Sequence, residues 1–95
     1  MNAFFVFVLS GVSAAYAAEL PTYDMDVYCQ ELAQHGGGAA ELVADCMRLE
    51  ETARTELALT WDSLAANTQD SCIQIGEMSG LSYDLLKACV DQMVE

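Results

Sequence analysis

The chain of 95 residues has few basic side chains, and only one histidine, one proline and one tryptophan. Three Lys and Arg residues stand against 15 Asp and Glu, which gives a formal net charge of −12. Nucleic acids and anionic membrane surfaces are bound through basic patches, so this scarcity argues against both classes of partner. A disordered acidic tail is also excluded, because 54% of the residues are hydrophobic.

The scarcity of bases also bears on catalysis. A nucleophilic Ser or Cys needs a neighbouring base, and only His35 and Lys87 could supply one. His35 precedes a run of glycines, where a helix is expected to end and a partly positive imidazole interacts well with the helix dipole. The cysteine spacings fit neither redox nor zinc motifs, and no loop is rich enough in Asp and Asn for calcium. We therefore expect no enzyme, no cofactor and no metal.

Residues 1–17 are expected to be a secretory signal peptide. They carry no charged side chain, and an apolar run at residues 4–9 is followed by small residues that end in Ala15-Tyr16-Ala17. Small residues at positions −3 and −1 are typical of a cleavage site, which places the cut after Ala17, with the bond after Ala18 as second choice. The competing interpretation is a retained membrane anchor, although small and polar residues interrupt a stretch that would need about 20 apolar positions.

Residues 18–95 are expected to form one small domain. A domain of this size is marginal without a covalent or metal staple, and the four cysteines can provide one. Disulfides persist in the periplasm or outside the cell, so the cysteines and the signal peptide indicate the same localisation, periplasmic or secreted.

The cysteine spacing repeats along the chain. Cys29 and Cys46 lie 17 positions apart, and so do Cys72 and Cys89. Superposing the second pair on the first also aligns the glycine breaks between them and the leucines that follow. We interpret this as an internal duplication of one supersecondary unit. The two copies span about residues 24–50 and 67–93.

Each copy is expected to be a helical hairpin. In the first, apolar side chains recur at helical spacing from Met25 to His35, with Asp24 as N-cap and the glycine run 36–38 as terminator. A second helical pattern runs uninterrupted from Ala39 to Leu64.

In the second copy, Asn67 or Thr68 can cap a helix that ends near Gly80, and Ser82 can cap a last one. The predicted fold class is all-α, with about four helices in two tandem hairpins.

Four cysteines allow three pairings, which spacing alone cannot separate. The first cysteine of each copy lies eight residues before the glycine break, at Gly37 or Gly80, and the second lies nine after it. In an antiparallel hairpin the two therefore sit at nearly the same height. We expect the bridges Cys29–Cys46 and Cys72–Cys89, each contributing about 3 kcal/mol in the chain-entropy model.

This arrangement resembles a family of small secreted proteins of rhizobia and other alphaproteobacteria, mostly of unassigned function. The family pattern is an aromatic–Cys pair, a Gly-Gly turn often followed by Ser-Tyr, and a second Cys with an acidic residue shortly after, all in two copies. The residues that carry the resemblance are Tyr23-Asp24, Tyr28-Cys29, Gly36-Gly37, Cys46 with Glu50, Trp61, Gly80-Leu81-Ser82-Tyr83 and Cys89. Ala39-Ala40 departs from the Ser-Tyr pattern, and the resemblance implies no known reaction or ligand.

The acidic charge exceeds what solubility requires and favours a cationic protein or peptide as partner. The leading hypothesis is a non-enzymatic binding or structural module, such as a lysozyme-inhibitor-like or peptide-sequestering protein. The alternative is an accessory subunit of a membrane or envelope complex that retains the N-terminal segment as anchor. Candidate contact residues are Tyr28, Glu50, Glu51, Trp61 and Tyr83. For Tyr28 and Trp61, burial in the hairpin core is the default expectation.

Overall fold

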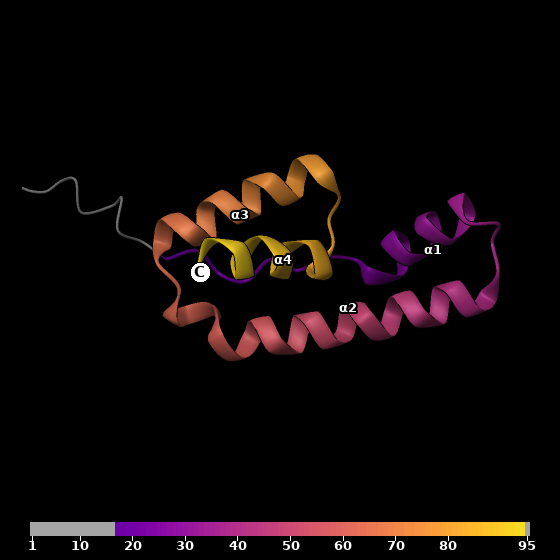
Figure 1. Ribbon diagram of the computed structural model, residues 1–95, viewed down its shortest axis with the longest axis horizontal. Coiled ribbons are helices and arrows are strands. Elements are labelled where there is room, and N and C mark those ends of the chain that lie inside the picture. The colour runs from indigo at the N-terminus through magenta and orange to yellow at the C-terminus, as the bar shows by residue number, and fades with distance from the viewer. Residues whose placement is uncertain (1–16, 95) are drawn as a thin grey trace, which may run out of the picture.

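The computed structural model describes residues 17–94, and this part of the chain is helical (Figure 1). Its elements are α1 (Met25–His35), α2 (Ala40–Thr60), the short 3-10 helix η2 (Trp61–Ser63), α3 (Ala66–Ser79) and α4 (Tyr83–Met93). α1 folds back along the first half of α2, whereas α3 and α4 pair with each other and α4 packs on α2. The predicted all-α fold of two hairpins is confirmed. The predicted signal peptide falls, except for Ala17, outside the described residues.

Both predicted disulfides are present. The first disulfide, Cys29–Cys46, joins α1 to α2 with a Cα–Cα distance of 5.5 Å. The second disulfide, Cys72–Cys89, joins α3 to α4 with a Cα–Cα distance of 5.7 Å. Each bridge therefore lies within one hairpin, and the two together indicate an oxidising extracellular or periplasmic environment.

Two of the predicted helix caps are confirmed. The Asp24 carboxylate accepts a hydrogen bond of 3.1 Å from the Val27 N–H, and the Ser82 hydroxyl accepts one of 3.2 Å from the Leu85 N–H. The glycine breaks are confirmed as well, because Gly37 and Gly80 have φ angles of 106° and 128°. Residues other than glycine rarely adopt such backbone angles, so Gly37 and Gly80 let the chain reverse its direction between the paired helices.

The boundary between the hairpins differs from the prediction. α2 ends at Thr60 rather than at Leu64, because the chain tightens into η2 and turns the Trp61 indole into the core. α3 then begins at Ala66, so neither Asn67 nor Thr68 is its cap. Gln69 links the start of α3 to the end of α2. Its side chain is fully buried, and its Nε2 donates a hydrogen bond of 2.7 Å to the Trp61 carbonyl.

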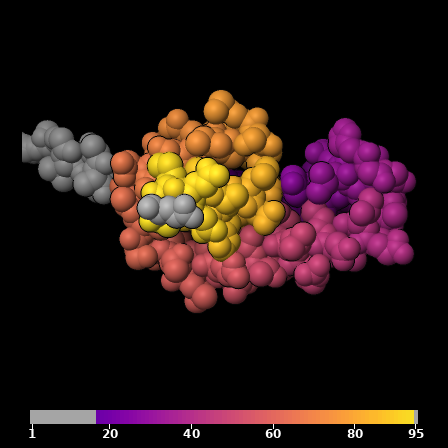
Figure 2. Space-filling model, viewed as in Figure 1, coloured from indigo at the N-terminus to yellow at the C-terminus, as the bar shows by residue number. Residues whose placement is uncertain are grey.

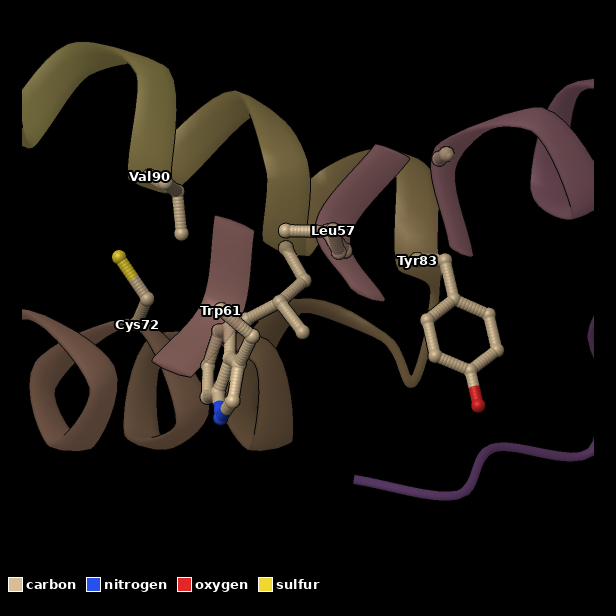
Figure 3. Close-up of a cluster of buried hydrophobic side chains, with 7 residues drawn as sticks. Leu57, Trp61, Cys72, Tyr83 and Val90 are labelled. Atoms are coloured by element: carbon tan, nitrogen blue, oxygen red, sulfur yellow. The ribbon is translucent and has the colours of Figure 1, made fainter. Parts of the chain in front are cut away.

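The hydrophobic core lies between the second half of α2, η2, α3 and α4 (Figure 3). It is formed by Ala53, Leu57, Trp61, Cys72, Tyr83, Leu86 and Val90. α1 contributes only the partly buried Met25 to this cluster, and the buried hydrophobic side chains where α1 meets α2 are the small ones of Cys29, Ala33 and Cys46. The first hairpin therefore projects from the core-bearing body, as Figure 2 shows.

An extended segment precedes α1 and lies against the second hairpin. We call residues 18–23 the N-terminal strap. The Tyr83 hydroxyl points toward it (Figure 3), accepting a hydrogen bond of 2.9 Å from the Tyr23 N–H and donating one of 2.9 Å to the Pro21 carbonyl. The rings of Tyr23 and Tyr83 are 4.9 Å apart. The strap is thus part of the fold.

Across residues 17–94, no helix has both the length and the hydrophobicity needed to span a membrane.

Candidate functional site

Three of the five predicted contact residues are buried in the fold. Glu50, Trp61 and Tyr83 are each 3% exposed or less, so the expectation that they face a partner is corrected. Trp61 and Tyr83 belong to the core, as the default expectation for Trp61 had it. The Glu50 carboxylate accepts hydrogen bonds from the first residues of α4 and holds α4 against α2.

Glu51, the fourth predicted contact residue, is exposed on α2 and lies 3.2 Å from the Arg54 guanidinium. Its charge is therefore largely compensated by a residue of the same helix. Exposed pairs of this kind contribute little to stability and offer little net charge to a partner.

The fifth predicted contact residue, Tyr28, lines a surface groove between α1 and the turn that joins α3 to α4. The hollow has a volume of about 400 Å³ and separates the two bodies seen in Figure 2. We call it the α1 groove, and it is lined by Asp24, Val27, Tyr28, Glu31, Leu32, His35, Gly80 and Leu81. It therefore combines residues from the two predicted repeats, which are far apart in the sequence.

The α1 groove carries large apolar side chains that remain in contact with solvent. Val27, Leu32 and Leu81 are 50%, 49% and 51% exposed. The half-buried Tyr28 ring packs close to Gly80, where an added Cβ would come within 3.8 Å of Tyr28 Cε1. A contiguous set of exposed apolar side chains with acidic neighbours is typical of an interaction surface.

The orientation of α1 follows from the first disulfide. The bridge turns Cys29 toward α2, and Ala33, one helical turn later, is buried on the same face. Tyr28, Leu32 and His35 recur at helical spacing on a neighbouring face, which is the one that lines the groove. The helical spacing of Tyr28, Leu32 and His35 in the sequence therefore marks the face of α1 that lines the groove, not a face buried in the core. Tyr28 was expected to be buried by default, and it is half-buried.

The charge of the groove is acidic and uncompensated by basic side chains of the described chain. All three Lys and Arg residues lie on α2 and α4, within 4.0 Å of carboxylates of those helices. Arg48 lies 3.8 Å from Asp45, and Lys87 lies 2.8 Å from Asp91. Asp24 and Glu31 therefore face the groove without a cationic partner, and His35 is its only basic lining residue.

A second hollow of about 590 Å³ lies between the C-terminal parts of α2 and α4. It contains Lys87, whose hydrogen bond to Asp91 raises the pKa of the ammonium and which also lies 3.5 Å from Glu56. Its acidic side chains are therefore already paired with a cation. The α1 groove is the stronger candidate for binding a positively charged partner.

Sequence reasoning missed most of the groove. The sequence predicts helix α1, which carries Val27, Glu31 and Leu32. It does not predict which face of α1 meets solvent, because that depends on the first disulfide and on the turn between α3 and α4. Leu81 was recognisable only as the residue after the predicted Gly80 break, and nothing in the sequence marked it as part of a groove. Within residues 17–94, no group of three or more His, Cys, Asp or Glu side chains is placed to hold a metal ion.

Comparisons with protein-family models, curated proteins and solved structures found no match to this chain. The resemblance to the alphaproteobacterial family stays a prediction.

Proposed function

We propose that this chain is an exported, non-enzymatic binding module whose α1 groove takes a cationic, amphipathic peptide segment of a partner protein or peptide. One observation carries the proposal: half-exposed apolar side chains share a groove with carboxylates that have no cationic partner, while the Lys and Arg side chains are paired elsewhere. A segment with Lys or Arg beside Leu or Phe matches both properties. Sequestration of such peptides and inhibition of a cationic enzyme are two forms of this one activity.

The magnitudes indicate that charge must contribute to binding. Complete burial of a Val or Leu side chain yields about 1.5–3 kcal/mol, so the exposed halves of three such residues yield roughly 3 kcal/mol in total. A micromolar complex needs about 8 kcal/mol. Ionic contacts with Asp24 and Glu31 are therefore expected to supply part of the difference, and salt is expected to weaken the complex.

The proposed export is supported by two independent features. The disulfides require an oxidising environment, and residues 1–17 have the pattern of a signal peptide.

The test is a titration with a synthetic helical peptide that carries Lys on one face and Leu on the other. Calorimetry at two salt concentrations should show binding that weakens with salt. A peptide with Glu in place of Lys should not bind, and one with Ser in place of Leu should bind much more weakly. No binding of the first peptide at millimolar concentration, or equal binding of all three, contradicts the proposal.

Protein variants locate the site. Leu81→Ser is expected to weaken binding about fivefold, because it removes about 1 kcal/mol of apolar burial. Met78→Ser is the matched control, since Met78 on α3 is 82% exposed and does not line the groove. Glu31→Gln should reduce both the affinity and its salt dependence. If Leu81→Ser and Met78→Ser bind alike, the peptide binds elsewhere.

A further inference from the structure

We infer that Gln69 and Trp61 form a binding site for the chain's own terminal residue Ala18, with Gln69 accepting from the α-ammonium group that cleavage after Ala17 creates and Trp61 donating to the Ala18 carbonyl. The inference rests on the export in the proposed function but not on the α1 groove. It concerns three residues, Ala18, Trp61 and Gln69, which we call the terminal clamp.

The terminal clamp is a closed set of hydrogen bonds. The Ala18 nitrogen donates to Gln69 Oε1 at 3.0 Å, and the Ala18 carbonyl accepts from Trp61 Nε1 at 2.8 Å. Gln69 Nε2 in turn donates to the Trp61 carbonyl at 2.7 Å. Both polar groups of the Ala18 backbone are thus held by side chains from η2 and α3, 43 and 51 residues further along the chain.

The clamp is built from buried side chains. Gln69 is completely buried and Trp61 is 2% exposed, so in the folded chain Ala18 takes the place of water as the hydrogen-bond partner of Gln69 Oε1 and Trp61 Nε1. Ala18 itself is half-buried, and Ala17 is exposed. Among the described residues, Ala18 is the first whose backbone is held by side chains of the helices, and it directly follows the first-choice cleavage site of the sequence.

The chemistry at this bond is a hydrolysis by a peptidase of the export machinery. Water adds as the C–N bond breaks, leaving a carboxylate on Ala17 and an α-amine on Ala18. The amine is protonated at neutral pH, since an α-amino group has a pKa of about 7.7–8.0. One N–H of the resulting ammonium keeps the direction of the former amide N–H toward Gln69 Oε1, and a hydrogen bond from a charged donor is about twice as strong as a neutral one.

The clamp discriminates between the two cleavage sites that the sequence allows. A cut after Ala17 keeps every contact of the clamp. A cut after Ala18 removes both Ala18 groups, so Gln69 Oε1 and Trp61 Nε1 lose the hydrogen-bond partners that they have in the folded chain, which destabilises the fold. Since Tyr23 and Pro21 are bound to Tyr83, the strap cannot slide to replace the lost residue.

The first measurement is the intact mass of the protein recovered after export from the full-length precursor. A mass of residues 18–95 supports the inference. A mass of residues 19–95 overturns it, and a retained N-terminal segment overturns both the inference and the proposed export.

The second measurement separates the clamp from the export. Chains that start at Ala18 and at Glu19 are prepared by cleavage of a fusion, and their unfolding equilibrium constants are measured in denaturant. The Glu19 chain should unfold with a constant at least tenfold larger. Gln69→Leu removes the polar amide at similar volume. It should raise the unfolding constant by a factor that is at least fivefold larger in the Ala18 chain than in the Glu19 chain, because Ala18 is present as a partner of Gln69 only in the former.

Asp70→Asn is the matched control, since Asp70 is exposed on α3 beside Gln69 and bonds only Gln74. It should change both chains equally. Equal stability of the two chains within twofold, or an equal effect of Gln69→Leu in both, overturns the clamp whatever the mass of the exported protein.

Discussion

Replacing Glu50 by glutamine removes one negative charge from the contact between α2 and α4 while it keeps the size of the side chain. In the native structure Glu50 Oε1 accepts from the Tyr83 N–H at 2.7 Å. Oε2 accepts from the Ser82 hydroxyl at 2.6 Å and from the Asp84 N–H at 3.1 Å. The carboxylate therefore satisfies two of the four N–H groups that a helix start leaves open, from a different helix.

The expected loss follows from this geometry. A glutamine amide has one oxygen and one NH₂ group, so in either orientation it turns a donor toward one of the two α4 N–H groups. A hydrogen bond to a charged group contributes about 1.5–3 kcal/mol, and a negative charge at a helix N-terminus adds about 0.3–1 kcal/mol. The lower cost of burying a neutral group offsets part of this. We expect Glu50→Gln to lower the free energy of unfolding by about 2–3 kcal/mol.

Thermal unfolding followed by circular dichroism measures this loss, because 1 kcal/mol corresponds to about 4–8 °C in Tm for a domain of this size. Glu51→Gln is the matched control, since Glu51 is the next residue, exposed and paired only with Arg54. It should change stability by less than about 1 kcal/mol. Ser82→Ala should be less harmful in the Glu50→Gln background than alone. A Glu50→Gln protein as stable as Glu51→Gln, or strictly additive effects with Ser82→Ala, would refute the reasoning.

The remaining predictions concern the strap and the two disulfides. Tyr23→Phe should leave the free energy of unfolding unchanged or raise it by up to about 1 kcal/mol, because the Tyr23 hydroxyl is buried without a hydrogen-bond partner. Tyr83→Phe should lower it by about 1–3 kcal/mol in chemical denaturation, because the Tyr83 hydroxyl bonds Tyr23 and Pro21. Burial raises the pKa of Tyr23 above its usual value of 10.0, so Tyr23 ionises at lower pH in the unfolded chain than in the folded one. The free energy of unfolding should therefore fall as the pH rises past 10.0. Unfolding curves at about pH 9–11 should show a smaller fall for Tyr23→Phe. Replacing the cysteines of the second disulfide by alanine should cost about 3 kcal/mol of global stability, whereas the same change in the first disulfide should release mainly α1, as hydrogen exchange of its amides would show.

Local features of the sequence predict the hairpins and their disulfides. A glycine break at equal distance from two cysteines sets their heights in an antiparallel pair, so Cys29 and Cys46 meet without reference to the rest of the fold. The caps Asp24 and Ser82 are equally local, because each bonds an N–H three residues further on. These predictions succeeded because the interactions that decide them lie within one turn or one hairpin.

Long-range contacts decide what the sequence could not predict. In the sequence Glu50 is one of two adjacent acids typical of a surface, yet its partners lie 32–34 residues away, at the N-cap and the first two residues of α4. α2 stops at Thr60 because the Trp61 ring is needed in the core and its indole N–H reaches Ala18. A repeated 3- and 4-residue spacing contains no information about such contacts, so the helix was expected to continue to Leu64.

The candidate site failed to appear in the sequence for a related reason. Of the predicted contact residues only Tyr28 lines the α1 groove, because the groove arises where α1 meets the turn at Gly80 and Leu81. The apolar spacing along α1 is as regular as that of a core helix. Which of its faces meets solvent is decided by the first disulfide, and that choice separates Tyr28 from the adjacent, fully buried Cys29.

In the first hairpin, the need for a disulfide is connected with the exposure of the apolar side chains that line the proposed binding groove. The buried hydrophobic side chains between α1 and α2, those of Cys29, Ala33 and Cys46, are small, so apolar burial holds α1 only weakly on α2. The covalent bridge replaces the missing core, since closing a loop of this length contributes about 3 kcal/mol. With the bridge holding α1, the larger side chains of Val27 and Leu32 are not required for packing. They can remain at the surface, beside unpaired carboxylates, where a partner can bury them.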